Sequence, residues 1–122
     1  MIEPVWVFVD AFLAVIEKPA GLLSVPGKHL QQPDLSAWVQ KRFPFAKAVH
    51  RLDQATSGLV LFALHAKTHA ALSTAFAKGC IEKHYIADVE GFIPQTSGEI
   101  HLPILSTPTI LKRMIDAKGK PA

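Results

Sequence analysis

The sequence has very little cysteine: Cys80 is its single example among 122 residues. One cysteine excludes an internal disulfide and favours a reducing compartment. No apolar run approaches the roughly 20 residues that a membrane-spanning helix needs. The first residues also lack the basic start and long apolar stretch of a secretory signal. We therefore expect a cytoplasmic protein with no membrane partner.

Charged residues are also few, at 19%, whereas hydrophobic residues make up 49%. This composition is typical of a globular chain and excludes a disordered one. The length suits one domain covering residues 1–122. The net charge of +3 is compatible with a polyanionic partner, but on its own it is weak evidence for one.

Local sequence patterns predict a mixed order of strands and helices. Apolar, β-branched or alternating runs indicate strands, and the two helices are bounded by start and stop signals. The predicted strands cover residues 5–9, 13–16, 58–64, 82–90, 98–102 and 110–115, and the predicted helices cover residues 33–42 and 67–78. The continuously apolar run at 58–64 predicts a strand buried on both faces. The order indicates an α+β fold with a mixed, mainly antiparallel sheet and two short helices.

Residues 50–58 form the most informative segment, because they place a cation, a carboxylate and two hydroxyls just before an apolar strand. Arg51 and Asp53 are two positions apart, so their side chains can share one face of an extended loop. The arginine would keep the aspartate ionised, while Thr56 and Ser57 would steady the loop through local hydrogen bonds. From these residues alone, an ordinary ion pair with a capping turn is a somewhat better explanation than a catalytic site.

The same segment, HRLD followed by TSGLVLFAL, resembles the signature of RluA-type RNA pseudouridine synthases. Other segments resemble this family in the same order. They are the strand and KPxG loop at residues 13–27, a K-x-Y-x-A strand at 82–87, and segments at 98–104 and 119–122. Several motifs in register are much stronger evidence than one. The LLSVPG and HRLD-x-ATSG sequences look closest to the dual-specificity branch, which acts on large-subunit rRNA and tRNA.

The resemblance implies a reaction and a role for individual residues. Such enzymes isomerise uridine in RNA by breaking the bond from C1′ to N1, turning the base and rejoining it through C5. Asp53 matches their catalytic aspartate, which acts as a nucleophile or as a base at the sugar. Arg51 matches the arginine that pairs with this aspartate and helps to replace the extruded base. Tyr85 matches the tyrosine that stacks on the flipped uracil and assists removal of the C5 proton. The residues expected to contact RNA are His50, Thr56, Ser57, Lys83 and Arg113.

The partner implied by the resemblance is a structured rRNA or tRNA loop, with no cofactor. His65 and His69 are spaced as zinc ligands often are, but no third ligand has a suggestive spacing, so we expect no metal.

The family's catalytic domain continues with a TGR-x-HQ-[IL]-R motif, which is absent from this sequence. We therefore expect a domain that is incomplete at its C-terminus, with an open sheet edge through which it can self-associate. A catalytically incomplete, RNA-binding fragment is the alternative function.

Overall fold

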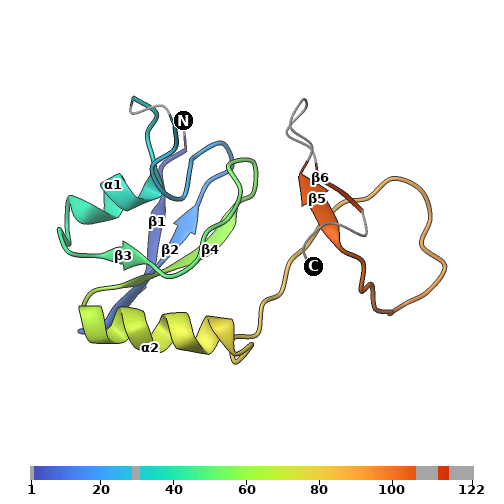
Figure 1. Ribbon diagram of the computed structural model, residues 1–122. Coiled ribbons are helices and arrows are strands. Elements are labelled where there is room, and N and C mark those ends of the chain that lie inside the picture. The colour runs from blue at the N-terminus through green and yellow to red at the C-terminus, as the bar shows by residue number, and fades with distance from the viewer. Residues whose placement is uncertain (1, 29–30, 107–112, 116–122) are drawn as a thin grey trace. The chain divides into compact units, whose positions relative to one another are not determined.

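The computed structural model describes residues 2–28, 31–106 and 113–115 of the chain. The chain divides into two compact units, Met1–His84 and Tyr85–Ala122, whose elements are labelled in Figure 1. Within the described ranges, neither helix has the length and apolarity needed to span a bilayer.

The first unit contains a four-stranded antiparallel sheet. Its strands are β1 (Val5–Val9), β2 (Leu13–Lys18), β3 (Lys47–Ala48) and β4 (Gly58–Ala63), and their order in the sheet is β1-β2-β4-β3. The pairing of β2 with β4 runs from Leu13 opposite Ala63 to Lys18 opposite Gly58. The end of β2 therefore lies beside the start of β4, where the loop carrying Asp53 joins the sheet. The predicted, mainly antiparallel sheet is confirmed.

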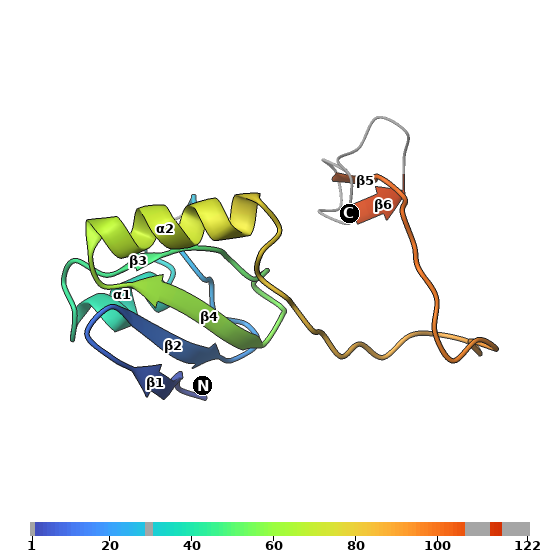
Figure 2. The same ribbon diagram turned by 90° about the horizontal axis from the view of Figure 1, so that it is seen from below.

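The two predicted helices are also confirmed, although the first is shorter than expected. They are α1 (Leu35–Gln40) and α2 (Ala66–Ala77), and Figures 1 and 2 show them on opposite faces of the sheet. Helix α1 begins where the Asp34 carboxylate accepts a hydrogen bond from the Ala37 amide at 2.9 Å, as expected of an N-cap. Helix α2 begins after His65, whose side chain makes no such capping bond.

The core lies between α1 and the sheet. Its fully buried members include Ile16 of β2, Val39 of α1, and Val60 and Phe62 of β4. Burying each such side chain contributes about 1.5–3 kcal/mol to the free energy of unfolding. At the edge of this core the Trp6 and Trp38 rings stack at 4.9 Å, and the Phe43 ring meets Trp6 edge-on. The core fixes β4, which follows the Asp53 loop, and β2, whose end lies beside the start of β4.

The structure corrects three sequence predictions. Strand β4 is not buried on both faces, because Leu59 is 56% exposed where α2 leaves the sheet uncovered. Residues 82–90 and 98–102, predicted as strands, are extended or irregular. A strand needs a hydrogen-bonded neighbour, and the described part of the chain provides none for these segments. In addition, strand β3 was not predicted, because two residues are too few to form a recognisable sequence pattern.

The second unit contains a small antiparallel pair, β5 (Ile104–Ser106) and β6 (Arg113–Ile115), in which Ile104 lies opposite Ile115. The prediction of a strand at residues 110–115 is thus confirmed for Arg113–Ile115, and residues 110–112 lie outside the described ranges. Before β5 the unit exposes several large apolar side chains, among them Ile86, Phe92 and Ile100.

Candidate active site

Asp53 lies in the loop between β3 and β4. The residue before it, Leu52, is held in place by Ser24, which lies in the segment after β2. The Ser24 hydroxyl donates a hydrogen bond to the Leu52 carbonyl at 2.7 Å and accepts one from the Leu52 amide at 3.0 Å. Ser24 and Leu52 are both buried. The Ser24 side chain therefore satisfies the buried amide and carbonyl of Leu52, which would otherwise lack hydrogen-bonding partners.

The residue after Asp53 is fixed by a second pair of contacts. The Gln54 carbonyl accepts a hydrogen bond from the Gly21 amide at 2.7 Å, and the Gln54 side-chain amide donates to the Gly21 carbonyl at 3.1 Å. Gly21 has φ of +94°, a backbone conformation that glycine adopts easily and other residues rarely do. The glycine of the KPxG turn thus permits a close, reciprocal contact with the Asp53 loop.

Lys18 also contacts both of these segments, the turn after β2 and the Asp53 loop. Its ammonium group donates to the carbonyls of Leu22 at 2.6 Å, Pro19 at 3.1 Å and Gln54 at 3.2 Å, and the residue is 0% exposed. Burial lowers the pKa of Lys18, and the negative charge of nearby Asp53 opposes this shift. Lys18 therefore connects the turn after β2 to the loop before β4 through backbone groups alone.

Asp53 itself is exposed between these two fixed neighbours. Its carbonyl accepts the Thr56 amide at 3.0 Å, which closes a turn after the carboxylate. The backbone that carries the carboxylate is therefore held in place, while the carboxylate itself is open to contact with a ligand. Arg51 is also exposed, and the ion pairs found among the described residues do not include one between Arg51 and Asp53. The catalytic roles of both residues stay predictions.

His50 anchors the start of the loop. Its Nε2 accepts a hydrogen bond from the Leu61 amide at 3.0 Å, and its ring stacks on Phe76 of α2 with 4.8 Å between ring centroids. Since an amide only donates, Nε2 carries no proton in this arrangement. Burial lowers the pKa of His50, and the positive charge of Lys83 lowers it further. These contacts are structural, and the predicted contact of His50 with RNA stays a prediction.

The His50 contacts lead us to expect a specific dependence of stability on pH. The pKa of His50 is lower in the folded chain than in the unfolded chain, whose histidines titrate near pH 6.5. Its stabilising effect is thus fully present above about pH 6.5 and is lost as the pH falls through the folded pKa. Melting temperatures measured from pH 5 to 8 should fall less steeply on acidification for His50→Gln than for the wild type. His84→Gln, at an exposed histidine, is the control, and parallel curves for His50→Gln and wild type would contradict the assignment.

The remaining predicted residues lie in different places. Thr56 and Ser57 complete the Asp53 loop, and Lys83 is exposed near the end of the first unit. Tyr85 opens the second unit, and Arg113 begins β6. The structure thus brings Arg51, Asp53 and Thr56 together in one loop, while the proximity of Tyr85 to Asp53 stays a prediction.

Sequence reasoning missed the residues that hold the loop: Ser24, Gly21 and Gln54. The sequence contains one signal for them, a serine set among apolar residues in Leu-Leu-Ser-Val. A polar residue in such a run is commonly buried with a hydrogen-bonding partner, but the sequence does not identify the partner.

The pair considered as zinc ligands, His65 and His69, is engaged with the backbone. His65 Nε2 lies 2.9 Å from the Ala11 carbonyl, and His69 Nε2 lies 3.3 Å from the Ala48 carbonyl. Because a carbonyl only accepts, both Nε2 atoms act as donors here. Among the residues that the structure describes, no group of three or more histidine, cysteine or acidic side chains is placed to hold a metal ion.

Comparison with known proteins identifies the class to which this chain belongs. The sequence model of the RNA pseudouridylate synthase family matches residues 13–121, a span that includes Lys18, the Gly21 turn and the Asp53 loop. The chain therefore belongs to this family, as the sequence motifs predicted.

Its curated relatives include proteins named dual-specificity RNA pseudouridine synthase RluA. That of Haemophilus influenzae is 40% identical over 100 residues, that of Yersinia pestis 42% over 97, and that of Escherichia coli 37% over 97. These matches cover 81%, 79% and 79% of this chain, but 46%, 47% and 44% of the relatives. The chain thus spans less than half the length of these relatives.

Proposed function

We propose that the protein converts uridine to pseudouridine in RNA, with Asp53 as the catalytic carboxylate. The observation that carries this proposal is the exposed Asp53 carboxylate, whose two neighbours in the chain are fixed by Ser24, Gly21 and Lys18. Membership of the RNA pseudouridylate synthase family supports it. The same residues would position the carboxylate before RNA arrives, so that binding does not have to order it.

The proposed chemistry is an internal transfer. The bond from C1′ to N1 breaks, a bond from C1′ to C5 forms, the C5 proton leaves, and N1 gains a proton. Asp53 acts at the sugar as a nucleophile or as a base, Arg51 occupies the space of the extruded base, and Tyr85 stacks on the uracil. The reactants and products balance without an oxidant or reductant, so the reaction requires no redox cofactor, and we propose that it uses none of any kind.

We propose rRNA or tRNA as the substrate, as the resemblance of the motifs to the dual-specificity branch implies. Relatives from three species are named as dual-specificity RNA pseudouridine synthases, which is consistent with this proposal. The proposed location is the cytoplasm. A second candidate is RNA binding without turnover, which is considered because the chain spans less than half the length of those relatives.

The target uridine should be unpaired, since a base in a loop costs less to extrude than a base in a duplex. The test uses an RNA hairpin with one 5-tritiated uridine, because formation of the bond to C5 releases the tritium. We expect release when the uridine lies in the loop and at least about tenfold slower release when it is locked in the stem. Binding should weaken with added salt, because phosphates are held by basic side chains.

Three outcomes of this assay are informative. Tritium release from the loop supports the proposal, and equal release from loop and stem contradicts the base-flipping mechanism. Salt-sensitive binding without release in either RNA favours the second candidate.

A further inference from the structure

A cavity of about 520 Å³ lies at the end of β4 that is opposite the Asp53 loop. It is lined by the segment between α1 and β3, by the last residues of β4 and by the first turns of α2. Its volume is within the range of small-molecule and nucleotide sites, roughly 300–1,000 Å³. The five steps along β4 from Gly58 to Ala63, at about 3.3 Å each, separate this cavity from the start of the strand by roughly 16 Å. The cavity is therefore distinct from the candidate active site.

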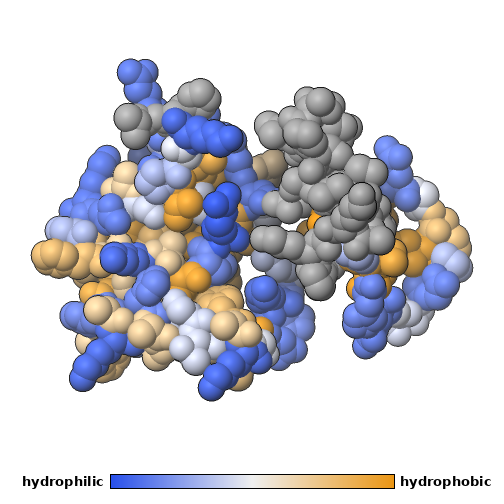
Figure 3. All heavy atoms as spheres, in the orientation of Figure 1, coloured by the Kyte–Doolittle hydropathy of each residue, from blue (hydrophilic) through white to orange (hydrophobic). Residues whose placement is uncertain are grey.

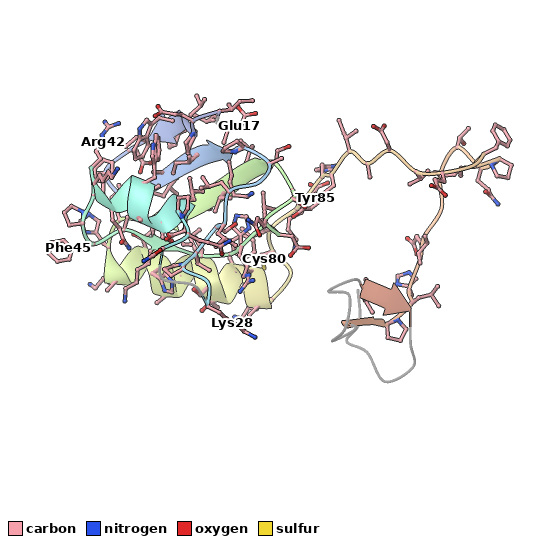
Figure 4. All side chains as sticks on the ribbon, turned by 90° about the horizontal axis from the view of Figure 1, so that it is seen from above. Glu17, Lys28, Arg42, Phe45, Cys80 and Tyr85 are labelled. Carbon is pink, nitrogen blue, oxygen red and sulfur yellow. The ribbon has the colours of Figure 1, made fainter. Side chains whose placement is uncertain are left out.

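The rim of this cavity carries an exposed aromatic side chain. Phe45 lines the cavity and is 86% exposed, and Figure 4 shows its ring projecting outward from the segment between α1 and β3. Two positions earlier, Phe43 packs against the core, whereas the Phe45 ring is open to solvent. Figure 3 shows apolar and hydrophilic residues interleaved over the surface of the first unit. The other lining residues are mainly apolar, and Gln40 and Lys47 add polar groups. An exposed aromatic ring beside a cation offers a face on which a base can stack.

The formal charge of the cavity lining is positive. Lys47 lines the cavity, and its lining includes no aspartate or glutamate. The first turn of α2 adds amide groups at the positive end of a helix dipole, and the His65 side chain bonds to Ala11 instead of capping them. These features favour an anionic ligand.

We propose that this cavity is a second RNA-contacting site, where an unpaired base stacks on Phe45 and an adjacent phosphate lies near Lys47. The proposal rests on the proposed function, because it takes RNA as the ligand of the active site as well. An aromatic ring beside a cation suits single-stranded RNA, whose bases stack without sequence preference while basic groups follow the backbone. An acidic peptide would satisfy the charge but would gain little from the exposed ring. The site would hold nucleotides flanking the target uridine.

The test measures binding of a fluorescent RNA hairpin with a single-stranded extension to the full chain by anisotropy. Phe45→Ala should weaken binding about tenfold, and Phe45→Tyr should restore it, because tyrosine keeps the stacking face. Lys47→Ala should reduce the slope of log affinity against log salt by about one phosphate contact. The matched controls are Phe92→Ala, at a ring that is 88% exposed in the second unit, and Lys28→Ala. Neither control should change the affinity by more than about twofold. Melting curves show whether each variant is folded.

A 4-thiouridine in the extension, irradiated in the complex, should crosslink to a peptide containing Phe45. Unchanged affinity in Phe45→Ala with the crosslink elsewhere would overturn the second site, while tritium release by the same protein would leave the proposed function intact. If polyglutamate displaced the hairpin equally well from the wild type and from Phe45→Ala, and this substitution left RNA affinity unchanged, the surface would bind anions or peptides in general. That result would also overturn the second site. A wild-type chain that binds no RNA would overturn both proposals.

Discussion

Asp53→Asn should lower the rate of pseudouridine formation by at least about 1,000-fold, while RNA affinity changes by no more than about twofold. Asparagine has nearly the same shape but no negative charge, so it can act neither as a nucleophile nor as a base at the sugar. The backbone contacts of Leu52 and Gln54 do not involve the carboxylate, and the loop should therefore keep its conformation. Single-turnover tritium release and anisotropy with the same hairpin separate the two effects.

The matched control for this substitution is Asp88→Asn, at an exposed aspartate outside the loop, which should leave turnover unchanged. Asp53→Glu keeps the charge but moves it by one methylene, and partial activity in this variant would indicate that the position of the carboxylate is important as well as its charge. Substantial turnover in Asp53→Asn would remove Asp53 from the chemistry and would require another nucleophile or base.

The Asp53 loop could be predicted from the sequence because its chemistry is local. The cation, the carboxylate and the hydroxyls lie within nine consecutive residues, and the apolar strand that supports them follows at once. The contacts that hold the loop could not be predicted in the same way. Ser24 and Leu52 are 28 positions apart, and Gly21 and Gln54 are 33 apart. Their pairing depends on the register of β2 against β4, and the continuously apolar runs at 13–16 and 58–64 lack the alternation that would specify that register.

The strand predictions differ in outcome for a similar reason. Residues 13–16 and 58–64 contain apolar side chains that pack against α1, so their pattern and their environment agree. Residues 82–90 have an alternating pattern, yet no described strand pairs with them. Alternation indicates that a segment is suited to a sheet, whereas a strand forms only where a neighbour supplies hydrogen bonds. The pattern at 82–90 therefore indicated that the segment is suited to a sheet, but it did not predict the conformation that the segment adopts.

Lys18→Met should destabilise the first unit by about 2 kcal/mol, because the variant leaves buried carbonyl groups without a donor. Methionine fills a similar volume, so the loss reports the ammonium group more than the packing. Three carbonyls lose the bond from the ammonium group. One of them is the Gln54 carbonyl, which directly follows Asp53 and keeps its bond from the Gly21 amide. The free energy of unfolding from urea titration gives the size of this effect, and Lys28→Met, at an exposed lysine, should change it by less than about 0.5 kcal/mol.

Lys18→Met should also reduce turnover, by about 10- to 100-fold, because a displacement of Asp53 by about 1 Å is enough for an effect of this size. Lys18 is a positioning residue in this account, since its ammonium group contacts backbone carbonyls and is completely buried. The loss should therefore appear in kcat, with KM for the hairpin nearly unchanged, at a temperature where melting curves show the variant fully folded. A purely structural role would instead give normal kcat in the folded variant, and that result would contradict the positioning of Asp53 by Lys18. Equal losses in kcat and in RNA affinity would indicate that the ammonium group acts on the RNA.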